Sequence, residues 1–301
     1  MTKAVLGIIG GSGIYDLPGL EKVRQKKIKS PWGEPSGALR MGEIAGTPVV
    51  FLARHDKGHR LSPSDINYRA NIDALKRAGV TDLVSLSACG SFKQDLPPGT
   101  FVLVDQFVDR TFNRASSFFG KGCVAHVSMA HPVSPRLQER IAAAAGLEGI
   151  EIVRGGTYVC IEGPQFSTKG ESQIYRRWGV SVIGMTNMPE AKLAREAELC
   201  YATLALTTDY DVWHESHAAV TVEAVVANLL KNVATAQVVL RRMIPRVGKP
   251  CTAGCGDALA SAVITNPKLF PPRTRRNLAL LLDRYFPGPA PAAKGRKARR
   301  G

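Results

Sequence analysis

Two aspartates, one residue apart, stand at the end of an apolar run and could perform acid–base chemistry. Asp209 and Asp211 close the segment TTDYD, which follows the apolar residues 201–206. If the chain turns there, both carboxyl groups face one pocket, and burial together with mutual repulsion raises the pKa of one of them. The pair would then hold an acid beside a base. A solvated loop, or Asp211 as the cap of a helix, is the other interpretation of these residues taken alone.

Hydroxyl, guanidinium and imidazole groups follow other apolar runs, and they suit an anion such as phosphate. Arg54 offers planar donors for bidentate contact, and His55 stands beside it. The GGSG segment at 10–13 offers backbone N–H groups and a hydroxyl, although a tight turn after a strand explains it equally well. We predict that a phosphate dianion is bound, without a metal ion, by Ser12, Arg54, His55, Ser87 and Thr186.

Three other kinds of site fit the sequence poorly. His55 and His59 are spaced as zinc ligands on a helix, but no Glu follows the first histidine and Gly58 indicates a loop. Asp16 stands where a dinucleotide-binding fingerprint needs its third glycine. Cys89 has no evident base nearby, so a packed thiol is favoured over a nucleophile. We therefore predict no metal ion and no cofactor, with inorganic phosphate as a co-substrate.

The elements that must position these groups alternate between buried strands and helices. Short runs rich in Val, Ile and Leu predict strands at 5–10, 48–53, 82–88, 101–107, 157–162, 180–185 and 201–207. Amphipathic patterns predict helices at 64–78, 134–146, 169–178, 189–198 and 221–243. Almost every strand runs into a polar or glycine-rich motif at its carboxyl end, where open α/β sheets bind ligands. One α/β domain with one composite site is therefore expected.

The chain has 301 residues and a formal charge of +15, part of which lies at the C-terminus. We predict a main domain over 1–248, a helical appendage of the same domain over 249–286 and a disordered basic tail over 287–301. The other Lys and Arg residues are dispersed, and no nucleic-acid-binding module is recognisable. Nucleic acid is therefore not expected as the main partner, whereas the basic field favours anionic substrates.

The apolar runs and the cysteines predict a cytoplasmic protein. No run approaches the roughly 18 residues that cross a membrane, and no cleavage site follows the N-terminal apolar residues. Four of the six cysteines stand in apolar contexts that are typical of buried, reduced thiols. Cys251 and Cys255 form a C-x3-C pair that could close a local disulfide, although a reducing compartment favours free thiols.

Eight motifs, taken in order, resemble the methylthioadenosine phosphorylases of the trimeric purine nucleoside phosphorylase family. They run from about residue 5 to 245: GIIGGSGIYD, ARHDKGH, NYRANI, ACGSF, DQFVDRT, EGPQFS, MTNMPE and TDYDVW. The resemblance implies a single α/β domain with a central mixed, twisted β-sheet flanked by helices. It also implies a homotrimer, or a hexamer of paired trimers, with active sites near subunit interfaces. The implied reaction is phosphate-dependent cleavage of 5'-methylthioadenosine to adenine and 5-methylthioribose 1-phosphate, a step of purine and methionine salvage.

The resemblance also assigns roles to individual residues. Ala88 joins Ser87 at the phosphate, and Ser167 stands at a specificity position where enzymes for 6-oxopurines carry Glu. The residues placed against ribose and purine are Met185, Phe166, Tyr210, Asp209 and Asp211. The residues that line the 5'-methylthio pocket are His126, Val222 and Val225, with His126 reaching the site of a neighbouring subunit. The region after about Gly248 departs most from the family pattern, so no pocket residue is assigned there.

Cleavage of the purine C1'–N9 bond leaves positive charge on the ribose and negative charge on the base, and both need stabilisation. Phosphate bound beneath the sugar would stabilise the positive charge on the ribose and act as the nucleophile. Asp209, protonated in a dry site, would donate to purine N7, while Asp209 or Asp211 accepts from the 6-amino group. The alternatives are a phosphorylase of the same fold for 6-oxopurine nucleosides or methylthioinosine, a hydrolytic nucleosidase, a nicotinamide dehydrogenase and an RNA-binding protein.

Overall fold

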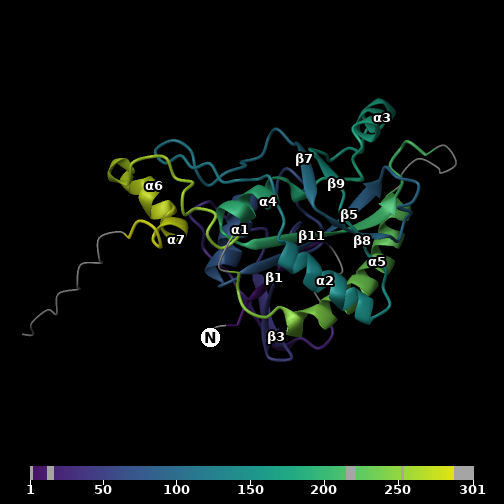
Figure 1. Cartoon of the computed structure of the whole chain (residues 1–301), viewed down its shortest axis with the longest axis horizontal. Coiled ribbons are helices and arrows are strands. Elements are labelled where there is room, and N and C mark those ends of the chain that lie inside the picture. The colour runs from purple at the N-terminus through teal and green to yellow at the C-terminus, as the bar shows by residue number, and fades with distance from the viewer. Residues whose placement is uncertain (1–2, 12–16, 215–221, 252–253, 288–301) are drawn as a thin grey trace, which may run out of the picture.

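The two longest strands, β5 (Asp82–Ser91) and β11 (Cys200–Asp209), lie side by side at the centre of one mixed sheet (Figure 1). The structure is a computed structural model, and it describes residues 3–11, 17–214, 222–251 and 254–287. Every β5 side chain except Ala88 is buried, as is every β11 side chain before Asp209. Such continuous burial is typical of a central strand whose two faces are both covered.

The sheet has two branches that meet at β5. One runs β2-β3-β4-β1-β5-β10-β9-β7, and the other leads from β5 through β11 and β6 to β8. The bounds of the other strands are β1 Leu6–Gly10, β2 Glu21–Lys26, β3 Leu39–Ile44, β4 Thr47–Ala53, β6 Phe101–Val104, β7 Gln106–Arg110, β8 Val153–Arg154, β9 Thr157–Ile161 and β10 Val182–Gly184. β1, β4, β5 and β11 are parallel, so their carboxyl ends point the same way. β10 is antiparallel to β5, which makes the sheet mixed, as the family resemblance implies.

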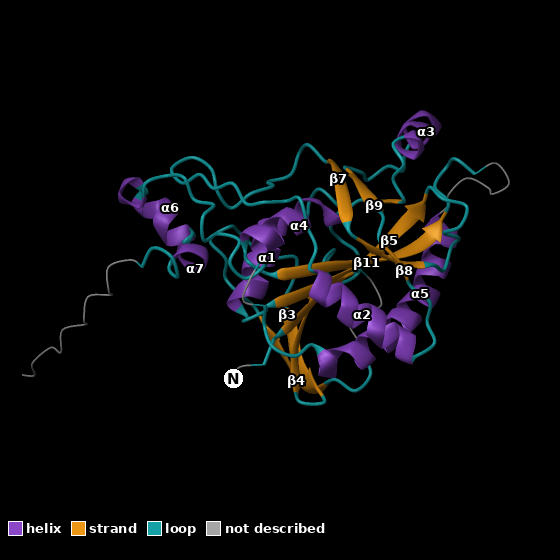
Figure 2. Ribbon diagram, in the orientation of Figure 1, coloured by secondary structure: helices purple, strands orange, loops and turns teal. Residues whose placement is uncertain are grey.

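Helices cover both faces of the sheet (Figure 2). On one face α2 (Pro135–Leu147) packs against α5 (Val222–Met243), which contacts β11. On the other, α1 (Tyr68–Arg77) packs against α4 (Asn187–Glu196), which contacts β5 and β11. Each layer buries its own cluster of aliphatic side chains against the sheet. α3 (Lys169–Arg177) stands apart at the end where β7 and β9 lie (Figure 1).

The observed strands differ from the predicted ones at several places. The predicted strand 101–107 is divided into β6, which ends at Val104, and β7, which begins at Gln106, and the two-residue strand β8 was not predicted. β5 continues to Ser91, beyond the predicted end at 88, because its last residues pair with β10 and β11. The prediction missed β2 and β3, because β2 is exposed along its whole length and carries no apolar run. No described helix is long and apolar enough to cross a membrane.

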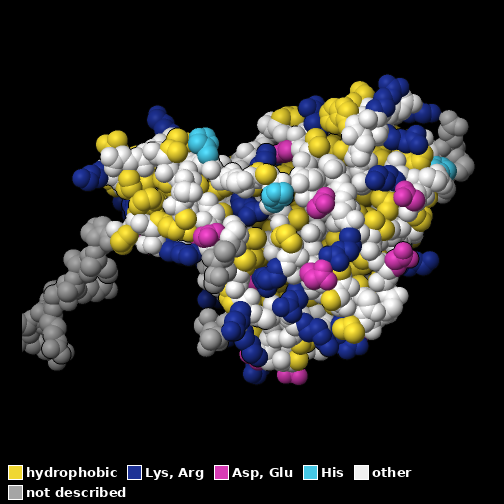
Figure 3. Space-filling model, in the orientation of Figure 1, with side chains coloured by type: hydrophobic (Ala, Val, Ile, Leu, Met, Phe, Trp, Pro, Cys, Tyr) yellow, Lys and Arg dark blue, Asp and Glu magenta, His cyan; other side chains and the backbone are white. Residues whose placement is uncertain are grey.

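The C-terminal segment extends to one side of the body and contains two short helices, α6 (Pro272–Asn277) and α7 (Ala279–Leu282) (Figure 1). It is continuous with the main core, because Leu259, Leu278 and Leu282 are buried in the same cluster as α1 and α4 residues. Figure 3 shows Lys and Arg side chains spread over several parts of the visible face of the molecule.

Candidate active site

Arg54 lies at the carboxyl end of β4 and is held in a buried ion pair. Its Nε and Nη2 donate to the Glu190 carboxylate at 2.8 and 3.1 Å, and both side chains are 2% exposed. Nη2 also donates to the Ser85 hydroxyl at 2.7 Å, and Nη1 donates to the Leu86 carbonyl at 3.0 Å. These contacts join β4, β5 and α4 around one guanidinium.

This arrangement limits the way in which Arg54 can contact an anion. The two-donor edge of its guanidinium binds Glu190, so it does not provide the bidentate phosphate clamp that the sequence suggested. The four bonds use four of its five N–H groups, and one Nη1–H remains for another acceptor. Arg54 can therefore contribute charge and a single donor to an anion beside Leu86.

His55 is a neutral imidazole with a defined tautomer. Its Nδ1 lies 2.9 Å from the Leu61 carbonyl oxygen, which can only accept, so Nδ1 carries the proton. Burial, together with the nearby charge of Arg54, lowers the pKa of His55 to about 4. Nε2 is consequently an acceptor at neutral pH. It would suit the hydroxyl of hydrogen phosphate rather than a charged oxygen.

Ser87, Ala88 and the residues after β10 lie together. The Ser87 hydroxyl is 3.0 Å from that of Tyr158, and a Cβ built on Gly184 would meet both the Tyr158 hydroxyl and the Ala88 carbonyl. Met185 and Thr186 follow Gly184 directly. Thr186 is the buried N-cap residue of α4, and its hydroxyl makes no capping hydrogen bond. Ser87 and Thr186 thus lie on neighbouring segments, linked by the approach of Gly184 to Ala88, and Ser87 follows Leu86, whose carbonyl accepts from Arg54.

The aspartate pair closes β11 through a bulge and a tight turn. The pairing with β5 shifts between Thr207 and Asp209, and such a bulge redirects the side chain that follows it. The Asp211 N–H donates to Asp209 Oδ1 at 2.8 Å, and Asp211 has a φ of 53°, a left-handed conformation that Asp tolerates. The turn on which the prediction of a shared pocket depended is therefore present. The two carboxyl groups belong to one local unit.

Burial makes both carboxyl groups weaker acids than an exposed aspartate. It raises the pKa of Asp209 and of Asp211, and for Asp211 the neighbouring Asp209 raises it further. Asp211 Oδ2 is buried and has no hydrogen-bond partner among the described residues. The same is true of Ser167 Oγ. Unpaired buried oxygens are costly, so both atoms are suited to a hydrogen-bond partner brought by a ligand.

The remaining predicted residues have different environments. Phe166 is 45% exposed next to Ser167, and its ring is open to a ligand. Tyr210 is buried, and its hydroxyl donates to the Gln94 carbonyl at 3.2 Å while its ring packs on Trp213. Its side chain thus already has packing partners, and contact with a substrate stays a prediction.

The predicted methylthio-pocket residues are only partly brought to this site. Val225 lies on α5 one turn before Asn228, which donates to the Thr208 carbonyl at 2.7 Å, so its helix is fixed against the end of β11. His126 is exposed, and its N–H donates to the Ala262 carbonyl of the C-terminal segment. Ser12 lies outside the described residues. Val222 is the first residue of α5, and its side chain is not among those described.

Several residues that position the site carried no sequence signal. Arg114 is fully buried, and it donates to the carbonyls of Met185 and Met188 at 2.7 Å each and to that of Glu162 at 2.6 Å. It therefore fixes the chain immediately before Thr186. Arg114 lies in a loop, three residues after the end of the DQFVDRT motif, and nothing in its type or spacing marked it as a residue of the site.

Residues 5–245 match the family described as the phosphorylase superfamily. A relative named S-methyl-5'-thioadenosine phosphorylase, from Bradyrhizobium diazoefficiens, is 66% identical over 96% of this chain and 100% of its own length. A relative of the same name from Rhodospirillum rubrum is 54% identical over 94% of this chain and 98% of its own.

Solved structures of similar proteins have the same fold. A methylthioadenosine phosphorylase sourced from an Antarctic soil metagenomic library superposes with a TM-score of 0.86 and 46% identity, covering 93% of this chain and 99% of that one. The methylthioadenosine phosphorylase of Schistosoma mansoni in complex with adenine has a TM-score of 0.82 and 34% identity, covering 87% and 99%. Most of the chain thus has solved counterparts of the same fold.

Proposed function

The chain belongs to the phosphorylase superfamily and, within it, to the S-methyl-5'-thioadenosine phosphorylases, and we propose that it cleaves 5'-methylthioadenosine with inorganic phosphate. The products are adenine and 5-methylthioribose 1-phosphate, so the enzyme is a pentosyltransferase of purine and methionine salvage. One observation beyond the likeness carries this function: the carboxyl groups of Asp209 and Asp211 are buried, have raised pKa values and are held two residues apart in one tight turn.

Phosphate binds at the edge where β4, β5 and α4 meet. The Ser87 and Thr186 hydroxyls and the remaining N–H of Arg54 donate to its charged oxygens, with Ser12 and the Ala88 backbone completing the site. His55, neutral with a free Nε2, accepts from the phosphate hydroxyl. Phosphate then attacks C1' from beneath the ribose, which Met185 contacts, and its negative charge stabilises the positive charge that develops on the sugar.

The aspartates act on the base. Asp209 in its protonated form donates to N7, which removes the negative charge that the departing adenine would otherwise carry. Asp211 Oδ2 accepts from the 6-amino group and Ser167 Oγ faces the same base, so both buried oxygens gain partners. A 6-oxopurine presents no N–H there and leaves Asp211 unpaired. A site built for such a bond can reject a substrate lacking it by about 10⁴–10⁵.

The quaternary structure, the compartment and the absence of cofactors are parts of the same proposal. The catalytic site requires no metal ion or cofactor, because hydroxyl, N–H and carboxyl groups meet every charge of the reaction. A homotrimer is supported by exposed apolar side chains, among them Val124 and Ile264, which lie on the paired segments that carry His126 and Ala262. A cytoplasmic location is proposed with it. In this assembly His126 completes the methylthio pocket of a neighbour, alongside Val222 and Val225.

A comparison of nucleosides tests the function. Adenine release from 5'-methylthioadenosine should require phosphate and should exceed base release from inosine and from methylthioinosine. Faster cleavage of the oxopurine nucleosides would assign the enzyme to the alternative specificity. Adenine release that is undiminished in phosphate-free buffer would make it a hydrolase. Sedimentation analysis of the same preparation measures the oligomer, and a monomer at working concentration would contradict the shared site.

A further inference from the structure

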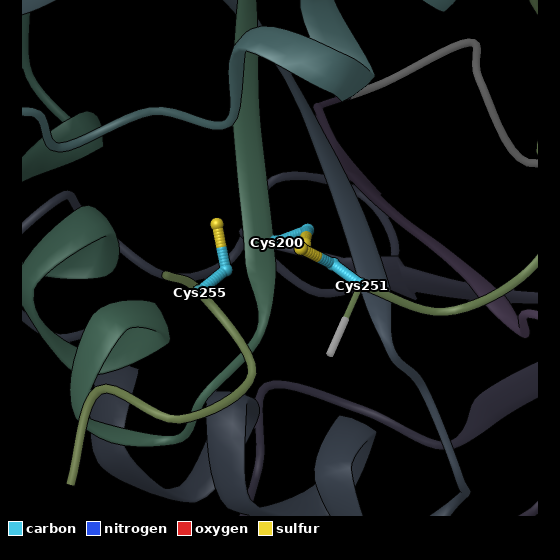
Figure 4. Close-up of side chains that lie close together, drawn as sticks. All are labelled: Cys200, Cys251 and Cys255. Carbon is cyan, nitrogen blue, oxygen red and sulfur yellow. The ribbon is translucent and has the colours of Figure 1, made fainter. Parts of the chain in front are cut away.

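Three cysteines outside the catalytic site converge on one point. Cys200 begins β11, and Cys251 and Cys255 lie on the segment that follows α5 (Figure 4). Their Sγ atoms all lie within 4.8 Å of one another. Cys200 and Cys255 are buried and Cys251 is partly exposed, and none of the three forms a disulfide in the described part of the chain. The cluster joins two segments that are about fifty residues apart in sequence.

We propose that Cys200, Cys251 and Cys255 bind one thiophilic divalent metal ion, of the Zn²⁺ type, with water as the fourth ligand. The C-x3-C spacing of the last two falls within the C-x2–4-C range of structural zinc sites, and the third cysteine comes from a rigid strand. A tetrahedral ion with Zn–S bonds of about 2.3 Å holds its sulfur atoms about 3.8 Å apart. Side-chain adjustments of roughly 1 Å therefore complete the site.

The charge around the cluster supports a metal centre. Arg195 is 9% exposed, and its guanidinium donates to the carbonyls of Gly254, at 3.3 Å, and His131. No carboxylate forms an ion pair with it among the described residues, and an uncompensated buried cation is costly. Three thiols that lose their protons to solvent and bind Zn²⁺ carry a net charge of −1. Such a centre supplies the missing counter-charge beside Gly254.

A second donor at the cluster lacks an acceptor. The Arg136 side chain contacts Cys200, and its buried Nε–H has no hydrogen-bond partner among the described residues. A metal-bound thiolate is a good acceptor for such an N–H group, and hydrogen-bond donors commonly surround the ligands of metal sites. A disulfide between any two of the three cysteines would instead leave a neutral pair, an unused third thiol and the charge of Arg195 uncompensated.

The metal ion would fasten the C-terminal segment to the body. That segment is otherwise held at this place by the bond from Arg195 to Gly254 and by Glu198, which accepts from the Leu259 N–H at 2.9 Å and from the Tyr285 hydroxyl at 2.5 Å. A bound ion would add a direct link from Cys251 and Cys255 of this segment to Cys200 of β11. We expect it to protect the backbone around Gly254 from hydrogen exchange without changing the chemistry of the catalytic site.

Metal content of the full chain, purified in reductant without chelator, tests this proposal. After addition of Zn²⁺ and removal of excess, elemental analysis should find about one ion per chain, and Co²⁺ should give sulfur-to-cobalt charge-transfer absorption. Cys255→Ser should lower bound metal at least tenfold. Cys251→Ser, at a partly exposed position, should do so too and guards against misfolding of the first variant. Cys123→Ser, a buried thiol outside the cluster, is the matched control and should bind metal normally.

Two results would overturn the inference. One is metal content that is absent, or equal in the native chain, Cys251→Ser and Cys255→Ser. The other is a disulfide within the cluster, found by mass spectrometry of unreduced peptides from protein kept anaerobic throughout. Neither outcome depends on phosphorolysis, so the proposed function stands or falls separately.

Discussion

Replacement of Asp209 by Asn should separate catalysis from folding. In the native chain Asp209 Oδ1 accepts from the Asp211 N–H at 2.8 Å, and Oδ2 accepts from the Thr208 hydroxyl at 2.7 Å. An amide keeps the first bond through its oxygen. Thr208 can reverse the second, because its hydroxyl also lies 3.2 Å from the Cys89 carbonyl and can donate there while accepting from the new N–H₂ group. The free energy of unfolding should therefore change by less than about 1 kcal/mol.

The effect on turnover should be far larger. An amide cannot release a proton to N7, and loss of a positioned general acid costs about 10²–10⁴ in rate, or roughly 3–5 kcal/mol of activation free energy. Because burial raises the pKa of Asp209, the native kcat should fall as pH rises through that pKa, and Asp209→Asn should lose this limb of the profile. The pH at which kcat falls is set by the raised pKa of Asp209.

Steady-state phosphorolysis of 5'-methylthioadenosine, with urea unfolding of the same samples, measures both quantities. Asp105→Asn is the control, because Asp105 is exposed and its carboxylate only accepts from the Gly156 N–H at 3.2 Å. The control should keep native kcat. Native turnover in Asp209→Asn would remove this residue from the chemistry. A loss of turnover matched by an equal loss of folded protein would show that Asp209 is structural.

Three further substitutions test the frame around the site. Gly90→Ala places a Cβ 2.7 Å from Asp209 Oδ1, so we expect kcat to fall at least tenfold with little change in KM for phosphate; an unchanged kcat would show that the carboxyl group has room to move. Glu190→Gln keeps a hydrogen-bonding oxygen but removes the negative charge opposite the buried Arg54, and it should cost about 3–5 kcal/mol in urea unfolding, whereas a loss below 1 kcal/mol would contradict the ion pair. His55 has its pKa lowered to about 4 in the folded state, so the unfolded chain binds more protons between about pH 4 and 6.5 and native stability should fall as pH falls through that window. The loss between pH 7 and 4.5 should be about 2.5 kcal/mol from this group, and His55→Asn should lose less by that amount.

The parts of the fold that a sequence can predict are those with a local cause. β11 and α5 are apolar or amphipathic over many residues, and their predicted limits, 201–207 and 221–243, lie within two residues of the observed ones. The same locality applies to the aspartate pair, because the turn that brings Asp211 N–H to Asp209 involves only neighbours in the chain. Strand β2 has no such signal, since it is exposed and held by pairing with β3.

The features that the sequence could not predict depend on contacts with residues far away in the chain. Arg54 has donors that suit phosphate, but its strongest partner, Glu190, is 136 residues away and stood within a helical pattern. The SACGS motif resembled a turn, yet it forms the end of β5 because strands lie on both sides of it. The cysteine cluster is of the same kind. The C-x3-C pair was interpreted as two free thiols that could also close a local disulfide, and only the fold brings Cys200 to it.

The buried ion pair of Arg54 has a consequence for how phosphate is selected. A guanidinium whose two-donor edge, Nε–H and Nη2–H, is free would bind any tetrahedral dianion, and sulfate would compete equally with phosphate. With that edge of the guanidinium held by Glu190, the proposed phosphate site would offer a single Arg donor, two hydroxyls and a neutral His55 whose Nε2 accepts. Only an anion that carries a proton can satisfy that acceptor. Sulfate, which has none at neutral pH, should therefore inhibit weakly, and His55→Gln, whose amide also donates, should narrow the difference between the two anions.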